Sequence, residues 1–205
     1  MKKWPITCIT GILIIIISWG GVIISVLLAP PPFSPLTNYL SSLGNSIYNP
    51  NGAIIYNSSV IISGILFLIF FIGFNQWYTN VKLDKIILSA IQIIGCFLSI
   101  IIVLTGLFSE DFYMEQHVLL SIIAGILGFL VQVSITFYLI KQEESIKRIS
   151  YSIFGLMVLY IVLLFILSPQ HVITEWVVRS IGDITLILMI YNLNYIYQVR
   201  NKTNS

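Results

Sequence analysis

Long apolar stretches alternate with short polar segments along the chain. Each stretch lacks the strict polar alternation of a strand and reaches about 20 residues, the length that a helix needs to cross the hydrocarbon core of a membrane. Helices suit this medium because their backbone polar groups are satisfied internally. The pattern therefore predicts an all-α membrane protein with six spanning helices in one bundle. The predicted spans are about 6–29, 53–74, 86–108, 117–140, 149–167 and 172–197.

The basic residues fall in alternate connections between these six spans. One side carries Lys2, Lys3, Lys82, Lys85, Lys141, Lys147, Arg148, Arg200 and Lys202. The connections on the opposite side contain no lysine or arginine, and one of them carries Glu110, Asp111 and Glu115. Cytoplasmic loops of membrane proteins are enriched in lysine and arginine, so this distribution predicts a cell-membrane protein with both termini in the cytoplasm. A count of five or seven spans would scatter the basic residues over both sides.

Composition supports lipid as the surrounding medium. Hydrophobic residues make up 58% of the chain and charged residues only 9%, whereas a soluble domain carries about 25% charged residues. Membrane lipids are therefore expected partners. The net charge of +2 and the lack of a basic, aromatic-rich loop exclude a nucleic-acid partner. No second domain is expected, and residues 1–205 are predicted to form a single transmembrane domain.

The first outer loop, residues 30–52, carries no charge and is rich in turn-forming residues. Ser34 suits a helix cap and Gly44 suits a helix end, so a short amphipathic helix is predicted between them. This segment fits two interpretations, a simple cap at the membrane interface or a lid over the bundle. The residues assigned to the lid are Ser41, Ser42 and Gly44.

The last predicted span contains three charged residues at helical spacing. Glu175, Arg179 and Asp183 follow one another at intervals of four, which stacks them on one helical face with the arginine between two carboxylates. Asp183 falls near the middle of the membrane core, where a charge needs a partner or water. Two interpretations remain open, a structural ion pair that sets helix packing and a site or pathway for a ligand or ion.

Further polar residues enter the bundle from the same outer side. Asn57 begins the second span and His117 begins the fourth. Together with the charged triplet they predict an outward-facing polar pocket. The predicted ligand-binding residues are Asn57, His117, Glu175, Arg179 and Asp183. The spacing matches no metal motif, no pattern predicts a cofactor, and the chain contains no G-x-S-x-G, H-E-x-x-H or P-loop, so no metal ligand or catalytic residue is assigned.

Several short motifs occur in an order that resembles a known family. Residues 39–44 read YLSSLG, an asparagine lies near the start of the second span, residues 106–110 read GLFSE, and His117 opens the fourth span. Over nearly the whole chain this order resembles the domain-of-unknown-function 998 membrane family and, more distantly, the damage-regulated autophagy modulator group. The resemblance implies a six-span bacterial or archaeal membrane protein of unassigned activity. It also implies an acid where this chain has Ser42.

Three functions are compatible with these features. We favour a non-enzymatic membrane protein whose outer pocket binds a lipid headgroup or a small ligand. A small proton-coupled transporter is the alternative, although no inverted repeat or Pro-broken helix is visible. An intramembrane hydrolase is a second alternative, because serine, histidine and acids are present without recognisable spacing. Small residues such as Gly125 and Gly128 fit packing within one chain or between copies in a homo-oligomer.

Overall fold

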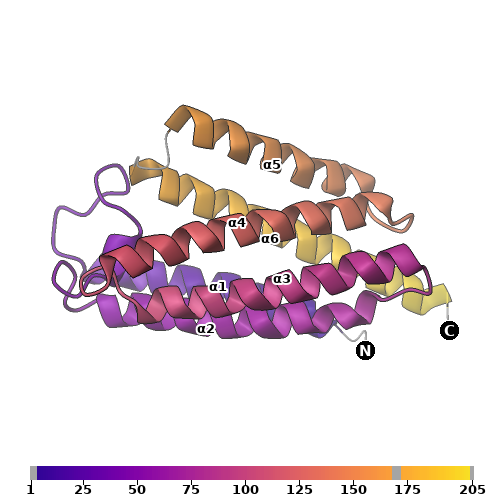
Figure 1. The fold of residues 1–205 in the computed structure, drawn as a ribbon, viewed down its shortest axis with the longest axis horizontal. Coiled ribbons are helices and arrows are strands. Elements are labelled where there is room, and N and C mark those ends of the chain that lie inside the picture. The colour runs from indigo at the N-terminus through magenta and orange to yellow at the C-terminus, as the bar shows by residue number, and fades with distance from the viewer. Residues whose placement is uncertain (1–3, 168–171, 204–205) are drawn as a thin grey trace.

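The structure, a computed structural model, describes residues 4–167 and 172–203, and all regular secondary structure within them is helical (Figure 1). Each predicted span corresponds to one long helix, so the predicted six-helix, all-α bundle is confirmed. The helices are α1 (Ile6–Leu28), α2 (Ala53–Ile72), α3 (Lys82–Leu107), α4 (Met114–Lys141), α5 (Lys147–Leu167) and α6 (Val172–Thr203). Two short 3-10 helices, η1 (Ser41–Gly44) and η2 (Gly73–Trp77), complete the set of described helices.

Five of the described helical segments are long and apolar enough to cross a membrane. These are Ile6–Leu28, Ala53–Trp77, Lys82–Leu107, Met114–Lys141 and Lys147–Leu164. Helix α6 is long enough at 32 residues but is more polar, because it carries the predicted charged triplet. Large apolar side chains such as Ile16, Ile93 and Ile126 are exposed on the outside of the bundle, which is the arrangement that lipid requires. The protein is therefore a multi-pass membrane protein.

The helices run up and down, and both ends of the described chain lie at the same end of the bundle (Figure 1). The described basic residues other than Arg179 also belong to the segments at this end, as the alternation of charge predicts; Lys2 and Lys3 lie outside the described residues. We call this the inner end, and we call the opposite end, which carries residues 30–52, the outer end. That the inner end is cytoplasmic stays a prediction.

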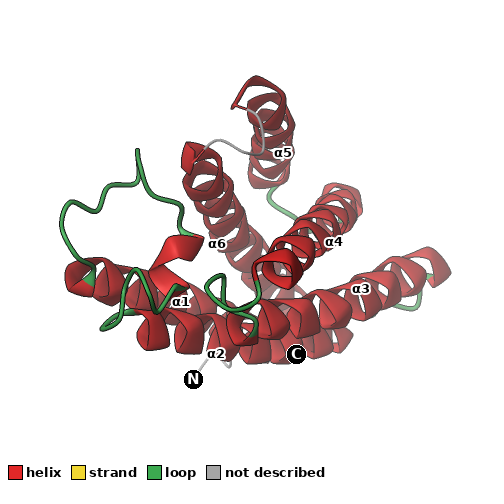
Figure 2. Cartoon of the chain, turned by 60° about the vertical axis from the view of Figure 1, so that its left-hand side comes forward, coloured by secondary structure: helices red, strands yellow, loops and turns green. Residues whose placement is uncertain are grey.

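Two groups of helices make up the bundle. Helices α1, α2 and α3 pack closely side by side, and α4, α5 and α6 fan over one face of this layer (Figure 2). Helix α6 packs on α1 and α4 packs on α3, while α5 contacts α4 and α6. Direct contact between α4 and α6 is sparse. This spread leaves room between the two helices above the layer.

The inner half of the bundle is closed by an aromatic core. Phe70, Phe71, Phe74, Trp77 and Tyr138 are all at most 2% exposed. The indole N–H of Trp77 donates to the Leu193 carbonyl at 3.2 Å, which joins the core to α6. Aromatic rings in edge and tilted contact fill the region around Phe74 and Trp77, which closes the bundle toward its inner end.

A polar network ties the inner ends of the helices together. The Arg200 guanidinium donates to Gln142 Oε1 at 2.6 Å and to Glu144 Oε1 at 3.2 Å, and Gln142 Nε2 donates to Asp84 Oδ2 at 3.1 Å. Partial burial acts to raise the pKa of Glu144, but the hydrogen bonds from Arg200 outweigh it and hold that pKa below its ordinary value. The network therefore joins α3 and α6 to the connection between α4 and α5.

The helix predicted between Ser34 and Gly44 is largely absent, and this prediction was wrong in extent. Ser34 begins a single turn, in which its carbonyl accepts the Asn38 N–H at 2.8 Å, and only Ser41–Gly44 is helical beyond it. The Asn38 carbonyl accepts the Trp176 indole N–H, and the Ser41 N–H donates to Glu175. Helix α6 thus uses the backbone groups that a continuous helix would have paired internally.

Candidate ligand-binding site

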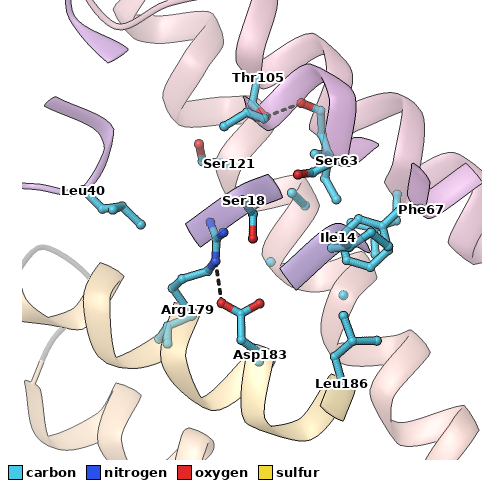
Figure 3. A pocket seen from close by; sticks show the side chains of 18 of the residues that line it. Ile14, Ser18, Leu40, Ser63, Phe67, Thr105, Ser121, Arg179, Asp183 and Leu186 are labelled. Atoms are coloured by element: carbon cyan, nitrogen blue, oxygen red, sulfur yellow. Dashed lines mark hydrogen bonds and ion pairs between the residues drawn. The ribbon is translucent and has the colours of Figure 1, made fainter. Parts of the chain in front are cut away.

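A cavity of about 450 Å³ extends from the outer loop into the interior of the bundle (Figure 3). Its walls come from α1, α2, α3, α4 and α6, and Leu40 and Ser41 of the outer loop also line it. Ligand pockets in proteins typically enclose ~300–1,000 Å³. The cavity is therefore of a size that suits a small ligand.

The two ends of the cavity differ in polarity. The inner end is mainly apolar, with Gln132 of α4 as a polar exception, and its apolar lining consists of Ile14, Phe67, Phe70, Phe71, Leu98, Val131, Ile135, Leu186 and Met189. The outer end is polar, and it is lined by Ser18, Ser41, His117, Ser121, Glu175, Arg179 and Asp183. One continuous space thus offers hydrogen-bonding groups at one end and hydrocarbon at the other. This is the polarity of an amphipathic molecule.

Helix α6 supplies an incompletely paired arginine at the boundary between these two ends. The Asp183 carboxylate accepts two hydrogen bonds on one oxygen, from Arg179 Nε at 2.7 Å and from Trp19 Nε1 at 2.9 Å. No hydrogen-bond partner is recorded for Arg179 Nη1 or Nη2 among the described residues, and the side chain is 26% exposed. Arg179 lies in the same space as Ser18 and Ser121 (Figure 3). Two guanidinium nitrogens therefore remain available to a ligand.

Glu175 connects the same helix face to the outer loop. Its Oε2 accepts the backbone N–H of Ser41 at 3.1 Å, and its Oε1 lies 3.5 Å from the Ser41 hydroxyl. One residue further on, Trp176 donates to the Asn38 carbonyl at 3.0 Å and meets Phe33 edge to face. These contacts hold the outer loop against α6 at the outer end of the cavity.

Asn57 acts on the outer loop and does not line the cavity. Its Nδ2 donates to the Gly44 carbonyl at 2.9 Å, and a Cβ added to Gly44 would lie 2.3 Å from Asn57 Oδ1. Glycine is thus required for this close approach. Ser42 is also absent from the cavity lining, so only Ser41 among the three predicted lid residues reaches the cavity.

A second asparagine anchors the outer loop, and the sequence analysis did not identify it. Asn49 is fully buried, and its Nδ2 donates to the carbonyls of Ser25 and Leu43 at 3.2 and 3.1 Å. The only signal for this residue was its place in an Asn-Pro turn, which does not distinguish an exposed turn from a buried one. The loop is consequently attached to α1 and α2 as well as to α6.

His117 lines the cavity from α4. Its Nδ1 lies 2.8 Å from the Phe108 carbonyl at the end of α3, and this contact orients the ring. The neighbouring Asp111 accepts the Ser46 backbone N–H at 2.9 Å. Partial burial acts to raise the pKa of Asp111, but hydrogen bonds from Ser109 and Ser46 lower it below its ordinary value. The connection between α3 and α4 is thus fastened to the outer loop.

Other residues in or beside the cavity emerge only from the packing. Trp19 is the second donor to Asp183, although it lies in a stretch that predicts nothing but a membrane span. The hydroxyl of Ser63 is buried with no hydrogen-bond partner among the described residues. On α4, a Cβ added to Gly125 would meet nothing within 4 Å, and one added to Gly128 would meet only Leu98, at 4.0 Å. This side of α4 faces open space inside the cavity.

The fold and the cavity define a class of protein. It is a polytopic α-helical membrane protein with a cavity inside the bundle that is polar at its outer end and mainly apolar at its inner end. The chain belongs to the family described as protein of unknown function (DUF998), whose model matches residues 12–192. The match covers most of the chain and confirms the resemblance drawn from the short motifs. The more distant resemblance to the damage-regulated autophagy modulator group stays a prediction. No curated protein and no solved structure matches the chain.

Proposed function

We propose that this membrane protein binds an amphipathic ligand, whose polar head meets Arg179 and whose apolar chain occupies the inner end of the cavity. One observation carries the proposal: Arg179 pairs through Nε alone and lines a cavity whose inner end is mainly apolar. A charge within a membrane is stable when it meets a partner or water. The fork of Nη1 and Nη2 matches the geometry of a carboxylate or a phosphate.

Binding is favoured over hydrolysis by the partners of the polar groups. The Ser41 hydroxyl contacts Glu175, whereas His117 Nδ1 contacts the Phe108 carbonyl. Among the described contacts no serine is hydrogen-bonded to a histidine, which a Ser-His nucleophile requires. Transport is less favoured, because the aromatic core around Phe74 and Trp77 fills the inner half of the bundle.

The proposal places the cavity in the outer half of the cell membrane, with the basic inner end in the cytoplasm. We expect a reporter tag inserted at Asn45 to be accessible only from outside the cell and one inserted at Ser145 only from inside. Labelling of intact and permeabilised cells with an impermeant reagent measures this directly. If the two tags share one compartment, the proposed orientation is wrong.

Filling the cavity is expected to abolish binding without disturbing the fold. Gly125→Leu places a large side chain in open space inside the cavity, so we expect at least about tenfold weaker binding of a short-chain lysophospholipid. Native mass spectrometry of the protein in nanodiscs counts the bound probe. The matched control is Gly155→Leu on α5, a position that also meets nothing within 4 Å but does not line the cavity. Equal binding by both variants would place the ligand elsewhere.

A further inference from the structure

We infer that the ligand of this cavity is a single-chain zwitterion, whose acidic group pairs with Arg179 and whose primary ammonium pairs with Glu175. The inference rests on the proposed function and specifies the chemistry of the ligand's head. A lysophospholipid with a phosphoethanolamine head is an amphiphile of this class. Three properties of the cavity support the inference, namely its balance of charge, the order of its charged groups and the kind of aromatic residue at its outer end.

Within the part of the chain that the structure describes, the charged side chains that line the cavity are two carboxylates and one guanidinium, those of Glu175, Asp183 and Arg179. A simple anion would satisfy the arginine but would enter a site with an excess of negative charge. A simple cation would satisfy a carboxylate but would leave the free nitrogens of the arginine without an acceptor. A head that carries both charges satisfies both requirements.

The charged groups lie in a definite order along α6. Asp183 is already engaged by Arg179 and Trp19, so the charged groups left to meet a ligand are the Nη groups of Arg179 and the carboxylate of Glu175, which also holds the outer loop through Ser41. These residues are one turn apart, which separates them by about 6 Å along the axis, and Glu175 lies nearer the outer end. From the inner end outward, the ligand thus meets hydrocarbon, then a cation, then a carboxylate. A phosphoethanolamine lipid presents the complementary order of chain, phosphate and ammonium.

The outer end of the cavity favours a primary ammonium over a quaternary one. Quaternary ammonium groups are recognised by cages of several aromatic rings. Among the described residues, Tyr56 is the only tyrosine, tryptophan or phenylalanine that lines the outer part of the cavity, since Phe67, Phe70 and Phe71 lie further in. Glu175 instead offers Oε1, which lies 3.5 Å from the Ser41 hydroxyl, at the outer limit of a hydrogen bond. Such an oxygen accepts an N–H, which a quaternary group does not have.

The test uses lysophospholipids that share one short acyl chain and differ only in the head. We expect lysophosphatidylethanolamine to bind the protein in nanodiscs about tenfold more tightly than lysophosphatidic acid, lysophosphatidylcholine or the neutral monoacylglycerol. Native mass spectrometry at several probe concentrations yields the dissociation constants. The ratio of the dissociation constants of two probes is the measured quantity. The acyl chain is the same in all four probes, so its contribution to the binding free energy cancels in this ratio.

Two variants test which residue binds which charge of the ligand's head. Arg179→Met is expected to weaken the ethanolamine and the phosphatidic acid probes alike, by about tenfold. Glu175→Gln is expected to weaken the binding of lysophosphatidylethanolamine only, because lysophosphatidic acid has no ammonium group. The glutamine still offers an oxygen to the Ser41 N–H, so the attachment of the outer loop is retained. Glu115→Gln is the matched control, since this exposed acid at the outer end does not line the cavity.

The possible outcomes separate the inference from the proposed function. Binding of phosphatidic acid as tight as that of the ethanolamine probe, with no effect of Glu175→Gln, would overturn the zwitterion while the binding function stands. Tightest binding of the choline probe would overturn the primary ammonium. If no probe binds the wild type more tightly than the cavity-filled Gly125→Leu variant, the proposed function itself fails.

Discussion

Replacing Gly64 with leucine is expected to abolish the folded protein, because the backbone of α3 lies directly against α2 at this residue. A Cβ at Gly64 would lie 2.7 Å from Val103 Cγ2, 3.0 Å from the Val103 nitrogen and 3.1 Å from the Ser99 carbonyl oxygen. Two of these atoms belong to the backbone of α3 and cannot rotate aside. Even Gly64→Ala should lower the free energy of unfolding by about 1–3 kcal/mol. Thermal unfolding followed by size-exclusion chromatography in detergent measures both variants.

The chain offers a matched control for this glycine. Gly20 also lies within a spanning helix, but a Cβ added there would meet nothing within 4 Å. We therefore expect Gly20→Leu to fold and to unfold at nearly the wild-type temperature. Wild-type stability of Gly64→Ala would contradict the close contact between α2 and α3. Small residues at helix interfaces are the usual means of such contact in membranes.

Asp183→Leu is expected to cause the second large effect. The substitution removes the acceptor shared by Arg179 and Trp19 and leaves a partly buried guanidinium without its carboxylate. Removing one partner of a buried ion pair costs about 3–5 kcal/mol, and the 14% exposure of the Asp183 side chain favours the lower part of this range. Equilibrium unfolding in a denaturing detergent compares the variant with the wild type.

Asp183→Asn separates shape from charge at the same position. An asparagine oxygen still accepts hydrogen bonds from Arg179 and Trp19, so we expect a smaller loss of stability than with leucine. Equal and small losses in the two variants would show that Asp183 contributes little to packing. The charged triplet was open to two interpretations, a structural ion pair and a ligand site, and these concern different atoms. Asp183 holds Arg179 in place through Nε, while the Nη groups of Arg179 remain open to a ligand.

The candidate site was partly predictable from the chain. The interval of four residues placed Glu175, Arg179 and Asp183 on one helical face, and all three line the cavity. His117 followed from its position at the outer end of a span and also reaches the cavity. Asn57 shared that position, yet its amide turns to the Gly44 carbonyl. Spacing within one helix is a local property, whereas the direction of a polar side chain depends on which neighbouring element offers a partner.

Membrane-spanning helices could be located because hydrophobicity acts on each segment separately: about 20 apolar residues partition into hydrocarbon whatever their neighbours do. The grouping of basic residues at one end followed from the number of spans alone. The rotation and spread of the helices depended on tertiary contacts, such as the close approach at Gly64 and the separation of α4 from α6. Those contacts brought Trp19 to Asp183 and drew the outer loop onto α6, so that its backbone bonded to Glu175 and Trp176 and formed no long helix. Such pairings join residues far apart in the chain, and no local pattern specifies them.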